Sequence, residues 1–240
     1  MAVTTHGVTG NVTTNAATYA TGNVGQAVND LLVTFALVTG TADAGDMTDS
    51  QGGSWTQITT AVKAASADKL WCFIRNARCP NADPLTVTMD VTGDNGTGCI
   101  IFVVRVSGMS RVGANAARQS AVQSNQAGAT TPAPVFGAAV LTGNPTLGFV
   151  GNATNPAGMT PPASWTELVI DVGYATPTSG GEYVTRDSGF TGTTITWGST
   201  SASAFGDIIV ELDTSVPPGR PFKLASQGGG LVGPPGRLAA

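Results

Sequence analysis

The sequence predicts an all-β protein, an antiparallel β-sandwich flanked by two extended arms, and three observations support this fold class. Short segments alternate apolar and polar residues with the period of a half-buried strand, and Leu85–Val91 does so without error. Turn sequences such as Ser179-Gly-Gly181 separate these segments. Charged residues make up only 11% of the chain, which contains 32 glycines. Ion-poor surfaces cost little to desolvate and therefore suit β-structure and close subunit contact.

The chain begins with a predicted extended N-terminal arm over residues 1–30. Met1–Asn29 holds no charged residue and is rich in Thr, Asn, Gly and Ala, which is typical of an extended leader or an edge rather than a helix. The first predicted strand, Leu31–Val38, is short, almost continuously apolar and bounded by Gly40, as expected of a buried strand. We therefore expect one sandwich domain over residues 31–215.

Further strands are expected along this domain. In chain order they are Trp55–Val62, Lys69–Arg75, Leu85–Val91, Cys99–Ser107, Leu147–Val150, Glu167–Tyr174, Glu182–Arg186, Thr193–Trp197 and Phe205–Asp213. Cys99–Ser107 is apolar on both faces, which predicts a central strand. Because apolar residues alternate in the strands that contain Glu167 and Glu211, both glutamates are predicted to face solvent.

A long connection at 108–134 interrupts the strand pattern. It contains the polar, alanine-rich segment Ala114–Ala127. Loops longer than about 12–15 residues are uncommon unless they are functional or flexible. Two interpretations carry equal weight: a crossing arm or contact loop, and a short helix that plugs one end of the sandwich, since alanine has a high helix propensity.

The chain ends with a predicted extended arm over residues 216–240. From Thr214 to Ala240 there are five prolines, six glycines, three positive charges and no acidic residue. Such a segment has no periodic apolar face, and its spaced apolar side chains would gain by lying on another surface. Arms of this kind join identical subunits, so a homo-oligomer is expected. The predicted partner-binding residues are Arg220, Phe222, Lys223, Leu224, Leu231 and Arg237.

Charge and hydropathy exclude two classes of partner. The formal charge of −4 and the pI near 4.7 argue against a nucleic-acid-binding protein, which needs a basic stripe to neutralise phosphates. No run approaches the roughly 18 apolar residues of a membrane span. Met1–Gly10 has neither the positive nor the apolar region of a secretion signal, so we expect the product to start in the cytoplasm.

The residues present do not predict an enzyme or a cofactor. His6 is the only histidine and lies in the predicted N-terminal arm, where nothing holds it beside a nucleophile as triad catalysis requires. Asp residues from across the fold could form a glycosidase pair, but their spacing in the sequence does not reveal one. No glycine-rich loop precedes a helix with the Lys-Ser or Lys-Thr of a phosphate site.

Metal sites are not predicted either. Asp43–Asp49 and Asp90–Gly96 cluster oxygen atoms as calcium sites do, but each would need further ligands to reach six to eight oxygens. The alternative is turns that the Asp and Asn side chains stabilise. Cys72, Cys79 and Cys99 lack the closely spaced pairs of a zinc site, so we interpret them as reduced structural thiols.

One tryptophan is a candidate ligand-binding residue. Trp197 is predicted to be exposed because Thr196, Gly198 and Ser199 flank it. An exposed indole face is a stacking platform for sugars, so Trp197 is a possible glycan contact. Trp165 opens a predicted strand and is expected in the core or at its edge.

Five features of the chain form a combination found in a known group of proteins. They are Ser54-Trp55, Asp83–Asp90, the Arg111–Gln126 connection, Ser164–Glu167 and the Pro/Gly-rich arm, set in an ion-poor β-body. Together they resemble jelly-roll structural proteins of tailed bacteriophage virions. The resemblance spans most of Leu31–Ser215 and is one of composition and pattern.

This resemblance implies a sandwich of jelly-roll type and a non-enzymatic virion component. That group includes capsid decoration (cement) proteins, head fibres and tail parts, and a decoration protein is the role we expect. It would bind the phage major capsid protein or another virion protein through its terminal arms, after assembly in the host cytoplasm. No binding residues carry over, because the group shares no site motif. The alternative is a carbohydrate-binding adhesin or receptor-binding virion protein that recognises a host glycan.

Overall fold

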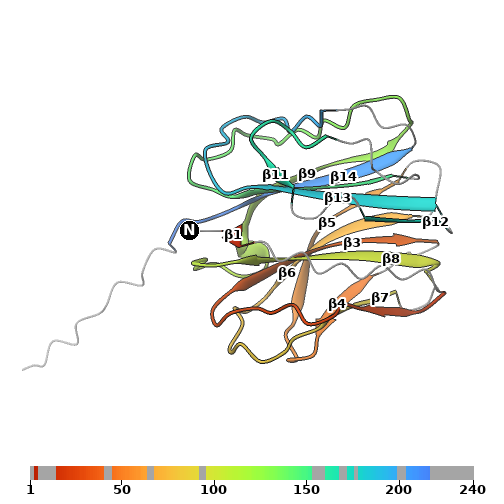
Figure 1. Ribbon diagram of the computed structural model, residues 1–240. Helices are drawn as coiled ribbons and strands as arrows, with labels where there is room; N and C mark the ends of the chain where they lie inside the picture. The colour runs from red at the N-terminus through yellow and green to blue at the C-terminus, as the bar shows by residue number, and fades with distance from the viewer. Residues whose placement is uncertain are drawn as a thin grey trace, which may run out of the picture.

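The computed structural model describes residues 3–4, 15–40, 45–63, 68–91, 96–152, 160–167, 172–175, 178–198 and 204–216. These residues form three antiparallel sheets stacked as layers (Figure 1). The fold class is therefore all-β, as predicted, and the sheets form a β-sandwich with an additional small sheet. Within this described part, no helix has the length and apolarity that a membrane crossing needs.

The sheets differ in size and in the part of the chain that builds them. The first sheet has the order β1 (Val3–Thr4), β8 (Gly98–Val106), β3 (Leu31–Thr39), β6 (Lys69–Arg75) and β5 (Trp55–Val62). The second has the order β11 (Thr166–Glu167), β13 (Thr178–Arg186), β10 (Thr146–Asn152), β14 (Phe205–Leu212) and β9 (Ala117–Gln126), with β12 (Val172–Ala175) also beside β13. The third has the order β2 (Thr18–Ala20), β7 (Val87–Asp90) and β4 (Asp46–Asp49). Strands β1 to β8 thus build the first and third sheets, and β9 to β14 build the second.

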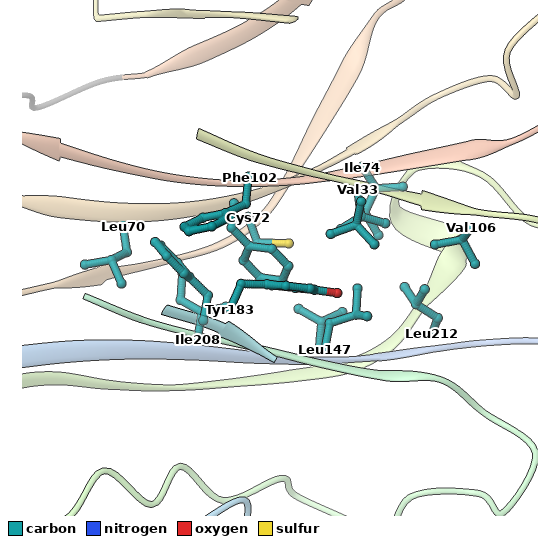
Figure 2. Packing of buried hydrophobic residues seen from close by; sticks show 14 of the residues in the cluster. Val33, Leu70, Cys72, Ile74, Phe102, Val106, Leu147, Tyr183, Ile208 and Leu212 are labelled. Atoms are coloured by element: carbon teal, nitrogen blue, oxygen red, sulfur yellow. The ribbon is translucent and has the colours of Figure 1, made fainter. Parts of the chain in front are cut away.

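The first sheet lies between the other two, which explains why its central strands are apolar on both faces. Every residue of β3 is buried. Phe35 packs toward the second sheet, 5.7 Å from Phe149 and 5.5 Å from Tyr183 between ring centroids. Its neighbour Ala36 belongs to the cluster that the first sheet forms with the third. Figure 2 shows the larger core between the first and second sheets, with Tyr183 among its labelled members.

The third sheet corrects the predicted domain boundary. Part of the expected N-terminal arm, residues 15–30, lies against the body and contributes the buried side chains of Tyr19 and Val24 to the core. The backbone N–H of Val24 donates to the carbonyl of Leu85 at 2.8 Å. The prediction that the folded domain begins at Leu31 was therefore wrong, because residues 15–30 already belong to it. The uncharged sequence was interpreted as an extended leader or an edge, and the edge interpretation is confirmed for Thr18–Ala20, the edge strand β2 of the third sheet.

The connection at 108–134 is also different from the prediction. Gly113–Ala116 forms a single 3-10 turn, and the next ten residues form strand β9, which pairs with β14 along its length. This segment therefore forms neither the predicted helix nor the predicted crossing arm. The hydrogen bonds offered by the open edge of β14 outweigh the helix propensity of alanine, because tertiary context routinely overrides propensity.

Most of the other predicted strands are confirmed. Trp55–Val62 and Lys69–Arg75 have the predicted bounds. Glu167–Tyr174 was predicted as one strand, and its two ends lie in β11 and β12, whereas residues 168–171 lie outside the described part. The expected acidic loop contains strand β4 instead of a turn alone.

Loops cover the outer face of the second sheet. Phe136, Val140 and Ile195 pack onto Ile209 of β14. The predicted strand Thr193–Trp197 belongs to this layer and was wrong, because within the described part of the chain it forms an isolated bridge, between Thr194 and Val135, and no regular strand. Its partner segment contains Pro132 and Pro134, which have no N–H to donate, so a regular ladder cannot extend there.

The first and second sheets approach closely where β14 crosses the end of β5. A Cβ at Gly206 would lie 2.9 Å from the carbonyl oxygen of Val62, a distance at which the backbone must shift. We expect Gly206→Ala to lower the free energy of unfolding by about 1–3 kcal/mol, the usual cost of overpacking. Urea denaturation measures this loss. Gly143→Ala is the control, because a Cβ there meets no atom within 4 Å; equal stability of the two variants would contradict the prediction.

Candidate interaction site where the chain leaves the body

The described chain ends at Val216, and the segment just before it, Asp213–Ser215, is fixed to neighbouring loops. Arg111 donates from Nε to the carbonyl of Ser215 at 3.1 Å and from Nη2 to its hydroxyl at 2.9 Å. The same Nε lies 3.0 Å from Oδ2 of Asp213. Thr214 donates its N–H and its hydroxyl to Oδ1 of Asn144, at 3.2 and 2.8 Å. These contacts define the point at which the chain leaves the body, which we call the exit.

Both ends of the described chain lie at the same end of the sandwich (Figure 1). Strand β1 pairs with the last residues of β8, where Val3 lies opposite Val106, and the loop after β8 supplies Arg111 to the exit. Partial burial raises the pKa of Asp213, but hydrogen bonds from Ser215 and the charge of Arg111 outweigh it, so the pKa is lowered. The carboxylate therefore stays charged and paired with Arg111 at neutral pH.

A buried carboxylate organises the loops beside the exit. Both oxygens of Glu211 accept hydrogen bonds: Oε1 from the backbone N–H of Leu141 at 2.9 Å and from Nδ2 of Asn144 at 2.7 Å, and Oε2 from Arg118 and Gln119. The prediction that Glu211 faces solvent was wrong, because its side chain is fully buried. The apolar face of β14 was predicted correctly. Its other face is covered by loops, and the alternation of residues along one strand does not reveal such a cover.

The predicted arm residues lie outside the described part of the chain. They are Arg220, Phe222, Lys223, Leu224, Leu231 and Arg237. The structure therefore fixes where the segment 217–240 begins, immediately after the exit, and their role as partner-binding residues stays a prediction.

Trp197 is buried, with 1% of its surface exposed, so the prediction of exposure was wrong. It packs with Val150, Val184 and Phe205 on the outer face of the second sheet. Its backbone N–H donates to the carbonyl of Pro132 at 3.1 Å, which places it within the covering loops. Small polar neighbours in the sequence indicated a surface turn, but the turn folds back onto the sheet. A ring in this position has no open face for stacking against a sugar.

The two acidic stretches hold no cluster of metal ligands among the described residues. Asp46 and Asp90 lie opposite each other in the third sheet, while Asp43 and Asp94 lie outside the described part. Asp49 points inward and accepts hydrogen bonds at Oδ2 from Nε of Arg75 at 2.8 Å and from the indole of Trp55 at 3.0 Å. Burial alone would raise the pKa of Asp49, but these hydrogen bonds and the charge of Arg75 have the larger effect, so the pKa is lowered. Asp49 is therefore the charged, buried partner of Arg75.

Burial also raises the pKa of two further titratable groups, the Cys79 thiol and the Asp207 carboxyl. Cys72, Cys79 and Cys99 are buried and form no disulfide, so their interpretation as reduced structural thiols stays a prediction that their burial supports. Burial raises the pKa of Cys79 to about 11, so the thiol is protonated and unreactive at neutral pH. Asp207 of β14 is buried as well, and burial raises its pKa to about 8. The sequence did not predict the burial of Asp207, because in the alternating pattern of its strand Asp207 falls on the face that was expected to be exposed.

Comparisons of the chain with protein-family models, with curated proteins and with solved structures gave no match.

Proposed function

We propose that this protein is a non-enzymatic structural component of a tailed bacteriophage virion, a capsid decoration protein that stabilises the shell through its terminal segments. The observation that supports the proposal most is the fixed exit. Arg111 and Asn144 hold the chain up to Ser215, so the Pro/Gly-rich segment 217–240 starts from a defined point on a tightly packed body. A fixed starting point on a rigid base is what an anchoring arm requires.

The distribution of charge supports the same role. Residues 1–216 hold all 15 acidic residues and eight of the 11 basic ones, a formal charge of −7, whereas residues 217–240 carry +3. A basic segment can lie on an acidic shell surface, where each exposed contact contributes little but many identical contacts add through avidity. The jelly-roll topology stays a prediction, and the strand order does not support it. Strands β1 to β8 build the first and third sheets, and strands β9 to β14 build the second. The burial of Trp197 leaves the carbohydrate-binding alternative without an observation in its favour.

The proposal is tested by binding to capsid shells. We expect the full chain to co-sediment with shells at saturation, and a chain that ends at Ser215 to lose at least tenfold in affinity, because its basic and apolar anchors are removed. Circular dichroism and thermal unfolding show whether the shortened chain keeps the fold. The full chain with Arg220→Glu and Lys223→Glu is a second variant that does not depend on truncation. If the shortened chain keeps its fold and still binds the shells at full occupancy, the proposal is wrong.

A further inference from the structure

The loop layer over the second sheet presents an apolar strip on its outer side. The strip comprises Val135, Ala138, Ala139 and Leu141, which are all exposed, with exposed fractions of 57% for Val135 and 51% for Leu141. Residues 135–143 include no charged residue. Single exposed apolar residues are ordinary on protein surfaces, whereas apolar residues that gather in one patch are typical of interaction surfaces.

The strip is held rigidly from below. Phe136 and Val140 alternate with its exposed residues and are buried against the second sheet. Gln119 exchanges two hydrogen bonds with the backbone of Ala138, at 2.9 and 3.1 Å. Arg118 donates to the carbonyl of Ala139 at 3.1 Å. A preorganised surface loses little conformational freedom when a partner binds.

The strip is continuous with the exit. The N–H of Asn144 donates to the carbonyl of Leu141 at 2.9 Å, and the side chain of Asn144 accepts hydrogen bonds from Thr214. Val216, two residues further along the chain, is 78% exposed. The residues that end the described chain therefore lie next to one end of the strip.

Charge and length indicate which segment covers the strip. The segment 217–240 combines apolar residues such as Phe222 and Leu224 with a charge of +3, and the body carries −7. Its 24 residues span up to roughly 80 Å when extended, against a body diameter of roughly 45 Å from the size law for compact domains. Such a segment reaches well beyond its own body to a neighbouring one.

We propose that the strip is the docking surface for the C-terminal segment of a second copy of this chain. Two copies exchange these segments, and Phe222 and Leu224 of one copy cover Val135 and Leu141 of the other. The exchange deepens the proposed role of the segment as an arm and rests on it. Each copy then donates one arm and receives one, which gives a closed, isologous contact.

Light scattering on full-length variants tests the exchange. The full chain, of 24.0 kDa, is expected at twice that mass. Val135→Ser with Leu141→Ser on the strip, and Phe222→Ser with Leu224→Ser on the arm, should each raise the dimer dissociation constant at least tenfold. Val28→Ser is the matched control, because Val28 is 53% exposed but lies outside the strip, and it should leave the mass unchanged. Thermal unfolding confirms that all variants keep the fold.

Mixing the strip variant with the arm variant separates exchange from docking within one chain. One intact strip and one intact arm remain in each mixed pair, so exchange predicts partial recovery of dimers. A monomeric full chain, or a dimer that neither double variant weakens, would overturn the inference. If the arm variant dissociates but the strip variant does not, the arm docks elsewhere and the inference also fails. Shell binding measured in parallel shows whether the proposed function survives such a result.

Discussion

Replacing Glu211 by alanine is expected to lower the free energy of unfolding by about 2–4 kcal/mol, because several hydrogen-bond donors lose their acceptor and each buried donor left unsatisfied costs about 1–3 kcal/mol. The side chain of Glu211 is fully buried and accepts hydrogen bonds from Arg118, Gln119, Asn144 and the N–H of Leu141. Its removal leaves these donors without their acceptor and the Arg118 guanidinium without its counter-charge. Guanidinium denaturation measures the loss as a shift of the midpoint.

The matched control is Asp83→Ala, because Asp83 is an exposed acidic residue on a loop. Its loss should stay within about 0.5 kcal/mol, as for most surface substitutions. Glu211→Gln keeps the shape but not the charge and should fall between the two. Equal stability of the Glu211→Ala and Asp83→Ala variants would show that the cluster does not hold the loops. Because the backbone of Leu141 is one of the donors, Glu211→Ala should also weaken the proposed dimer.

Short-range periodicity predicts many strands of this fold well. Lys69–Arg75 and Trp55–Val62 were found at their predicted bounds, since alternation and turn residues are local properties of the chain. The double-sided apolar pattern of Cys99–Ser107 correctly indicated a strand that is covered on both faces, although β8 lies second from the edge of its sheet and β3 is the central strand. These successes rest on physics that acts between neighbouring residues.

The wrong predictions share one cause: the structure there depends on residues that are distant in the sequence, and a local pattern holds no information about them. Ala117–Gln126 becomes a strand because β14, which lies about 80 to 95 residues later in the chain, offers it an edge. Glu211 and Trp197 are buried because loops fold over the outer face of the second sheet. The charge-free run from Val135 to Leu141 was visible in the sequence, but only the covering layer shows which of its side chains point outward.

Asp207→Asn is expected to make the protein more stable, by on the order of 2–4 kcal/mol at pH 8. Asp207 accepts a hydrogen bond at Oδ1 from the N–H of Gln123 at 2.9 Å, while its buried Oδ2 has no hydrogen-bond partner among the described residues. Burial raises the pKa of Asp207 to about 8, far above its value of about 3.9 in the unfolded chain. The folded protein therefore holds a proton there that the unfolded chain has released.

The sign of the pH dependence follows from this difference. A group whose folded pKa is raised contributes no penalty below about pH 4, and its penalty grows as the pH rises to about 8, by about 1.4 kcal/mol per pH unit at most. Asparagine carries no charge in either state, so the advantage of Asp207→Asn should be small at pH 4.5 and largest at pH 8. Urea midpoints at pH 4.5, 6 and 8 measure it, with Asp83→Asn as the exposed control. An advantage that does not change with pH would mean that Asp207 is charged in the folded protein, and then Oδ2 must have a partner that neutralises it.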